Sequence, residues 1–209
     1  TPLEYLLEVE GGRITYAAQL SWEQFLRKGD VVVDATMGNG HDTLFLAEAV
    51  LEGAEGGEMV RGRVVAFDIQ QQALDSTRAL LEARLPPGHL QGVELVCGCH
   101  SRITEAVGAG TAKLIAFNLG YLPKGDKNVK TTAPTSCAAV EAALKALAPG
   151  GVISIMCYPK HEGGREEYEA LVGLAAGLGT GRYTSSEHRI INRSGSPILL
   201  MIYRRADDR

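Results

Sequence analysis

Apolar residues follow two patterns along this chain: short continuous runs, and longer segments in which they recur every three or four positions. The short runs are rich in β-branched residues and are typical of strands buried on both faces of a sheet. They predict strands at 31–34, 63–68, 93–97, 113–118 and 152–157. The periodic segments predict helices at 17–27, 44–51, 70–84, 138–147 and 165–178.

The end of the chain shows a different pattern. Residues 183–191 and 198–203 predict two strands joined across 192–197, which indicates a β-hairpin. Strands that alternate with helices and finish in a hairpin predict an α/β fold with a doubly wound sheet, mostly parallel with one antiparallel strand. No internal repeat or linker interrupts the pattern. Residues 1–209 are therefore expected to form a single domain, with 1–29 as an N-terminal helical extension.

Composition narrows the class of protein. The net charge of −4 and the 45% hydrophobic content favour a globular domain without a general basic surface. No apolar run reaches the roughly 18 residues of a membrane-spanning helix, so no membrane partner is expected. The four cysteines lack the spacing of a zinc site, which predicts no metal and favours reduced thiols in a reducing compartment. That compartment is the cytoplasm or, if a transit peptide has been removed, the chloroplast or the mitochondrial matrix.

The segment 31–43 (VVVDATMGNGHDT) predicts an anion-binding corner, because a buried strand, a glycine turn and a helix N-terminus follow one another. A dinucleotide fingerprint would need a third glycine where Thr43 stands, and a phosphate-binding Walker loop would need a lysine. The order acid-x-x-x-Gly-x-Gly instead resembles the first motif of S-adenosylmethionine methyltransferases. In that interpretation, the helix N-terminus receives the methionine carboxylate, and Asp34 with turn carbonyls receives the ammonium group.

A second acid, Asp68, ends the predicted strand 63–68. Its carboxylate can accept hydrogen bonds from both ribose hydroxyls of the cofactor, and it can equally cap the next helix. Gln70 follows near the expected adenosine. The loop after strand 93–97 holds His100, for which a cofactor contact and an ordinary surface position remain equal alternatives.

The end of strand 113–118 predicts the acceptor site. Enzymes that methylate amines often carry Asp, Asn or Ser, then two prolines and an aromatic residue, at this place. Asn118 and Tyr121 keep that spacing, whereas Leu119 and Gly120 replace the prolines. We expect Asn118 to hold the target amine and Tyr121 to stack on a planar base. The alternative is an ordinary strand–loop junction with a buried tyrosine.

Several of these segments together resemble the family long labelled putative rRNA methylase. They are 34–43 (DATMGNGHDT), 67–72 (FDIQQQ), 117–123 (FNLGYLP), 125–127 (GDK) and 191–192 (IN). The resemblance runs from about residue 17 to near the end of the chain. It implies the Rossmann-like fold of class I S-adenosylmethionine-dependent methyltransferases, with S-adenosyl-L-methionine as donor.

Characterised members of that family, bacterial and plant, modify the wobble uridine of transfer RNA. They convert 5-aminomethyl-2-thiouridine to its 5-methylaminomethyl form, so the resemblance implies a tRNA anticodon loop as substrate. This chain departs from the bacterial pattern in its longer loop 52–62, in Cys97-Gly-Cys99, and in His161, which follows Tyr-Pro-Lys rather than Tyr-x-Gly. His161 is nevertheless a candidate proton acceptor. A homodimer is also considered.

The motifs and the resemblance together give three sets of candidate site residues. The catalytic set is Asn118, Tyr121 and His161. The cofactor-binding set is Asp34, Gly38, Asn39, Gly40, Asp42, Thr43, Asp68, Ile69, Gln70, His100, Ser101 and Asn118. The RNA-binding set is Lys124, Lys127, Lys130, Arg182, Arg189 and Arg193.

Two other classes of function compete with this interpretation. One is methylation of ribosomal RNA or of a small molecule by the same chemistry. The other is a non-catalytic module that keeps the fold as an RNA-binding factor. The intact acids and glycines of the two cofactor motifs argue against the second. An NAD-dependent enzyme is a more distant alternative, because Thr43 replaces the third glycine.

Overall fold

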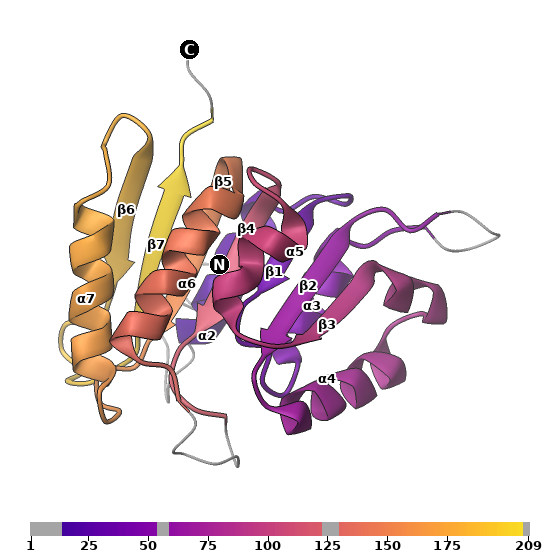
Figure 1. The fold of residues 1–209 in the computed structure, drawn as a ribbon, viewed down its shortest axis with the longest axis horizontal. Coiled ribbons are helices and arrows are strands. Elements are labelled where there is room, and N and C mark those ends of the chain that lie inside the picture. Colours follow the sequence, from indigo (N-terminus) through magenta and orange to yellow (C-terminus); the bar gives the residue numbers. More distant parts are fainter. Residues whose placement is uncertain (1–13, 54–58, 123–129, 207–209) are drawn as a thin grey trace.

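The computed structural model describes residues 14–53, 59–122 and 130–206. Its centre is a seven-stranded sheet in the order β3-β2-β1-β4-β5-β7-β6 (Figure 1). The strands are β1 Val31–Asp34, β2 Arg63–Asp68, β3 Val93–Cys97, β4 Ala112–Asn118, β5 Leu147–Cys157, β6 Tyr183–His188 and β7 Ile198–Arg204. β1 to β5 pair in parallel, and β7 pairs antiparallel with both β5 and β6. The prediction of a doubly wound sheet with one antiparallel strand in a C-terminal hairpin is therefore confirmed.

Helices cover both faces of this sheet (Figure 1). The main helices are α2 Ile14–Phe25, α3 His41–Val50, α4 Gln71–Arg84, α5 Ile103–Val107, α6 Ala133–Ala146 and α7 Gly164–Ala176. Short 3₁₀ turns, η1 Pro87–Gly92 and η2 His100–Arg102, precede β3 and α5. Alternate side chains of the strands enter two separate cores. One core packs under α5, α6 and α7, and the other packs under α2, α3 and α4.

β1, β2 and β3 occupy the predicted ranges. β5 begins at Leu147, five residues before the predicted start at 152, and takes in the last residue of the predicted helix 138–147. α6 begins five residues before the prediction. Its N-cap is Thr132, whose backbone N–H donates to Thr135 Oγ1 (3.0 Å), and Pro134 lies in its first turn. The short helices η1, η2 and α5 were not predicted, because they have too few residues to show a period.

Other limits also differ from the prediction. β6 ends at His188 rather than at residue 191, because its pairing with β7 stops there. α2 begins at Ile14 and buries Ile14, Ala17, Ala18 and Trp22. No described helix is long and apolar enough to span a bilayer.

Candidate active site

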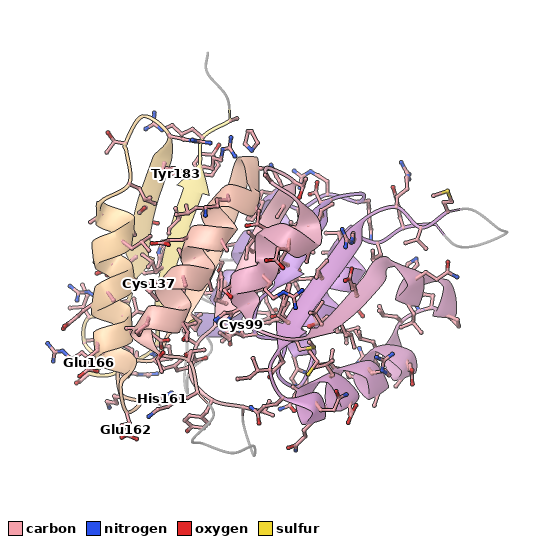
Figure 2. The ribbon with its side chains drawn as sticks, in the orientation of Figure 1. Cys99, Cys137, His161, Glu162, Glu166 and Tyr183 are labelled. Atoms are coloured by element: carbon pink, nitrogen blue, oxygen red, sulfur yellow. The ribbon has the colours of Figure 1, made fainter. Side chains whose placement is uncertain are left out.

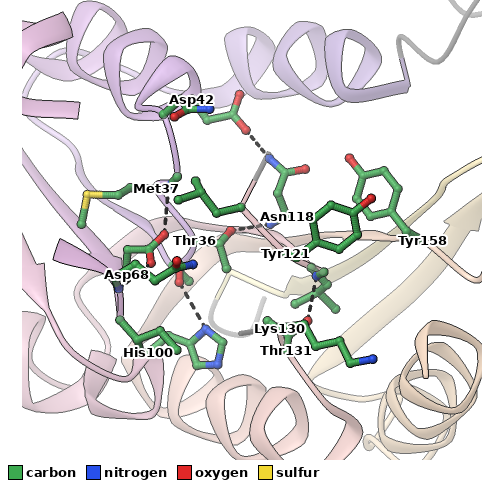
Figure 3. A pocket seen from close by; sticks show the side chains of 18 of the residues that line it. Thr36, Met37, Asp42, Asp68, His100, Asn118, Tyr121, Lys130, Thr131 and Tyr158 are labelled. Carbon is green, nitrogen blue, oxygen red and sulfur yellow. Dashed lines mark hydrogen bonds between the residues drawn. The ribbon is translucent and has the colours of Figure 1, made fainter. Parts of the chain in front are cut away.

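A cavity of about 620 Å³ opens at the carboxyl edge of the parallel strands. Its walls come from the loops after β1, β2 and β3 on one side and from those after β4 and β5 on the other (Figure 3). β1 and β4 are neighbours, so the connections leave the sheet in opposite directions between them. Such a reversal of strand order creates the crevice in which open α/β sheets bind ligands.

The glycine corner shapes one wall of the cavity. Gly38 and Gly40 have φ values of 51° and 85°, which side-chain-bearing residues rarely adopt. A Cβ on Gly40 would lie 2.9 Å from the backbone Cα of Thr77 in α4. The turn therefore packs directly on α4, and the N-terminus of α3 faces the cavity with its unpaired N–H groups.

Asp34 lies beneath this corner, with 2% of its surface exposed. Its carboxylate accepts hydrogen bonds from Thr43 Oγ1 (2.6 Å) and from the N–H of Thr36 (3.1 Å). Burial, and then the nearby charge of Asp42, raise the pKa of Asp34 to about 7. Asp34 therefore braces the turn from below and does not line the cavity itself.

Asp68 lies in the cavity wall at the end of β2. One carboxylate oxygen accepts from the N–H of Gly38 (3.2 Å) and the other from the N–H of Gln70 (2.9 Å). These bonds tie the first turn to the start of α4. Each oxygen keeps a further lone pair, so the carboxylate can still accept hydroxyl donors.

Asn118, at the end of β4, is held at both its backbone and its side chain (Figure 3). Its N–H donates to Thr36 Oγ1 (2.6 Å), and its Nδ2 donates to Asp42 Oδ2. Asp42 Oδ1 accepts from Gln19 Nε2 (2.6 Å) of α2. The carbonyl oxygen of the Asn118 side chain is buried and has no hydrogen-bond partner.

Three rings lie together in the wall opposite the glycine corner. The His161 ring stacks on Tyr158 with centroids 5.0 Å apart and planes 5° apart, and it contacts Tyr121 at 4.9 Å. His161 Nδ1 is buried and unpartnered. Burial and the charge of Asp42 raise the pKa of Tyr158 to about 12, so its hydroxyl keeps its proton.

The loop after β3 contributes His100 to the cavity. Its Nδ1–H donates to the carbonyl of Ala35 (3.2 Å), and its ring meets Phe117 edge-on. Burial lowers the pKa of His100, which keeps the imidazole neutral. Ser101 lies outside the cavity and donates to Cys99 Sγ. The structure thus separates these two neighbouring candidates.

Comparison with known proteins decides the family. Residues 64–204 match the family model described as "Putative rRNA methylase". A curated relative from Arabidopsis thaliana, "tRNA (mnm(5)s(2)U34)-methyltransferase, chloroplastic", is 38% identical over 194 residues, which are 92% of this chain and 70% of the relative. The chain belongs to the rRNA methylase family.

Solved structures agree with this assignment. A Clostridium thermocellum protein described as a putative rRNA methylase superposes with a TM-score of 0.82 at 31% identity, covering 94% of this chain and 99% of its own. A Streptococcus mutans protein, described as a putative methyltransferase in complex with SAH, gives a TM-score of 0.76 at 30% identity, with the same coverage. The Rossmann-like methyltransferase fold and S-adenosylmethionine as cofactor, both expected from the motifs, are consistent with these relatives.

The cavity of this rRNA methylase family member fits that cofactor. The N-terminus of α3, Asp68 at the end of β2 and Asn118, whose side-chain carbonyl oxygen is buried without a partner, all line this cavity. Predicted cofactor contacts that line it are Gly38, Asn39, Asp42, Asp68, Ile69, Gln70, His100 and Asn118. Asp34, Gly40 and Thr43 lie behind them as support. All three catalytic candidates, Asn118, Tyr121 and His161, also line it.

Sequence reasoning missed several lining residues. Thr15 and Gln19 reach the cavity from α2, and Thr36, Cys99 and Tyr158 reach it from strand-end loops. Thr36, Cys99 and Tyr158 carried a local signal, since each lies inside or beside a motif, whereas Thr15 and Gln19 carried none. No metal-binding group of three or more His, Cys, Asp or Glu residues occurs within the described ranges.

The candidate RNA contacts are dispersed. Lys130 lines the cavity and pairs with Glu162 at 3.1 Å, whereas Lys124 and Lys127 lie outside the described residues. β6 runs in the same direction as β1 to β5, so Arg189 follows its carboxyl end, on the cavity side. Arg182 precedes Tyr183, which lies at the opposite end of the sheet from His161 (Figure 2). Arg182 is therefore not part of the group near the cavity.

Proposed function

We propose that this chain transfers a methyl group from S-adenosylmethionine to the primary amine of 5-aminomethyl-2-thiouridine at the wobble position of transfer RNA. The observation that carries the proposal is the side chain of Asn118. Its carbonyl oxygen is buried, lacks a partner, and lies in the wall of the cavity. The name of the Arabidopsis relative, 38% identical over most of this chain, supports the same acceptor.

An amine acceptor explains why a buried carbonyl oxygen is left unpaired. Leaving this oxygen without a partner costs about 1–3 kcal/mol, and an N–H donor would recover that cost. Bound S-adenosylmethionine would supply an activated methyl group, so the protein mainly aligns the amine and excludes water. Asn118 would hold one N–H of the amine. Asp68 and the N-terminus of α3 would hold the donor.

The amine must also lose a proton. His161 Nδ1 is buried without a partner in the same cavity and is our candidate acceptor. The cysteines do not serve as nucleophiles in this proposal. Burial raises the pKa of Cys157 to about 12, and burial beside Glu141 and Glu167 raises that of Cys137.

An anticodon loop is suited to such a site because its unstacked bases can be turned out into a pocket. We propose an RNA-binding face made of Lys130, Lys160, Arg189 and Arg193, with Lys124 and Lys127 as further candidates. Lys160 packs across Gly195, where an added Cβ would lie 1.7 Å from its Cε. The hairpin turn that carries Arg193 therefore lies beside the turn that carries His161.

Three further expectations stay predictions: a homodimer, an N-terminal extension at 1–29, and the compartment. The Arabidopsis relative is described as chloroplastic.

The deciding experiment is incubation with labelled cofactor and transfer RNA that lacks only the final methyl group. We expect the wild type to transfer the methyl group. Asn118→Ala should slow transfer by about 100-fold, because the amine is no longer aligned with the methyl group. Asp68→Ala should weaken cofactor binding by about 10- to 100-fold. Full activity in both variants would refute this site. Transfer to ribosomal RNA or to free nucleoside instead would refute the acceptor but not the chemistry.

A further inference from the structure

The side-chain amide of Asn118 can face the cavity in two ways. Its oxygen and nitrogen ends have nearly the same shape, so hydrogen-bond partners alone decide which end points where. The partner here is Asp42, which has only acceptor oxygens when ionised and therefore selects the Nδ2 end. The Oδ1 end is left buried and without a partner in the part of the cavity wall that Asn118 contributes.

This choice matters for the chemistry. A carbonyl oxygen accepts an N–H of the amine and leaves the nitrogen lone pair free to attack the methyl group. A reversed amide would present an N–H donor, which would bind that lone pair. The methylation step therefore needs one orientation of Asn118 and is blocked by the other.

Asp42 itself is fixed by α2. Its second oxygen accepts from Gln19 Nε2 (2.6 Å), across 23 positions in the sequence. Gln19 lies on the same helix as Ala18 and Trp22, which are buried in the core, and Trp22 packs edge-on against Phe45 of α3 at 5.9 Å. Gln19 is thus presented by a helix that the core holds in place, and it reaches into the cavity together with Thr15.

We propose that Gln19 is a positioning residue for methyl transfer: it fixes Asp42, which in turn holds the Asn118 amide with its carbonyl oxygen toward the acceptor amine. This inference rests on the proposed function, because it assigns the purpose of Asn118 to an amine acceptor. It makes α2 a part of the active site. Without Gln19, the Asp42 carboxylate keeps only one of its two side-chain partners and can turn away from Asn118.

The test uses the full chain and two variants of Gln19. Gln19→Ala removes the side chain, and Gln19→Glu keeps its size but removes the donor. Gln24→Ala is the matched control, because Gln24 is on the same helix and exposed. Three quantities are measured: the single-turnover rate at saturating cofactor, the cofactor Kd by calorimetry, and, without cofactor, hydrogen exchange of the Asn118 side-chain amide by NMR.

We expect both Gln19 variants to lower the rate by about tenfold, with the cofactor Kd within about twofold of wild type, and to speed exchange of the Asn118 amide. Gln24→Ala should match wild type in all three. Wild-type rates in both Gln19 variants would overturn the inference. So would weaker cofactor binding with an unchanged saturated rate, since Gln19 would then be a cofactor contact. If the wild type itself transfers no methyl group to the RNA, the proposed function fails. Hydrogen exchange of the Asn118 side-chain amide still tests whether Gln19 positions Asn118.

Discussion

Three carboxylates gather at the glycine corner, and they play different parts. Asp68 and Asp42 line the cavity, whereas Asp34 lies buried below it. The charges of Asp42 and Asp68 add to burial in raising the pKa of Asp34. Burial also raises the pKa of Asp42. At Asp34, this crowding of negative charge disfavours ionisation, and it favours a positively charged ligand at the corner.

The first prediction concerns Asp34 and pH. Its pKa is about 7 in the folded protein against 3.8 for the ordinary group, so the folded state binds the extra proton between these values. Its contribution to stability is therefore complete below about pH 4 and is lost as the pH rises through about 7. We expect Asp34→Asn to raise the free energy of unfolding by about 2 kcal/mol at about pH 8, and by much less at about pH 5.

Denaturant titrations at the two pH values measure this difference. The variant should also show a shallower fall of stability with pH than the wild type. An equal effect of the substitution at both pH values would mean that Asp34 is ionised throughout.

Sequence spacing identified these residues but could not say which face of the turn each occupies. The acid-x-x-x-Gly-x-Gly pattern places Asp34 at the strand end, and the structure shows that Thr43 and Thr36 use its carboxylate. The contact of Gln19 with Asp42 joins two helices, and nothing near either residue in the sequence points to it. Contacts of that kind follow from tertiary packing and not from local pattern.

At the scale of elements, α2 has two distinct faces. Ile14, Ala18 and Trp22 pack into the core below α3, and Thr15 and Gln19 face the cavity. The sequence predicted this helix from its apolar period, as part of an N-terminal helical extension. The structure shows it packed against the fold and in contact with the site.

The second prediction tests how firmly α2 is attached. Trp22 is 3% exposed, and its Nε1–H is buried without a partner. Trp22→Ala should cost about 3–5 kcal/mol of unfolding free energy. Trp22→Phe should cost less than about 1.5 kcal/mol, because it keeps most of the ring contacts and removes an unpaired donor.

Circular dichroism in increasing denaturant gives both values. Trp22→Phe should retain methyl transfer, since Gln19 keeps its place. A loss of several kcal/mol in the Phe variant would mean that the helix depends on packing of the full indole ring, which phenylalanine does not fill.

The strands of the sheet were predictable for a simple physical reason. β2 lies between two neighbouring strands and is buried along most of its length, so its apolar run is continuous and sharply bounded. The start of α6 was not predictable from apolar period, because its first turn is set by a threonine cap and a proline. β6 is an exposed edge strand, and its weaker pattern ran three residues too far.

At the scale of the whole molecule, net charge and local charge differ. The chain carries a net charge of −4, yet Lys160 and Arg193 lie on adjoining turns beside the cavity. We therefore expect attraction to RNA to come from a local group of basic residues such as the proposed RNA-binding face, and to weaken with added salt.

The third prediction follows from that arrangement. Lys160→Ala and Arg193→Ala should each weaken RNA binding and lower the slope of log Kd against log salt by about one. Arg182→Ala, at the opposite edge of the sheet, is the control and should leave the slope unchanged. Cofactor affinity should be unaffected in all three.

Electrophoretic mobility shifts over a salt series measure the slope. An unchanged slope in both cavity-side variants would remove them from the RNA-binding face, and a collapse of cofactor binding would assign them a structural role instead.

The order β3-β2-β1-β4-β5 divides the strand-end loops that line the cavity into two groups, apart from the contribution of α2. The loops after the first three strands would grip the donor, and those after the next two would meet the acceptor. Selection can therefore rework the second group, from Asn118 through His161, while the first is inherited intact. Related enzymes would therefore change their methyl acceptor more readily than their methyl donor.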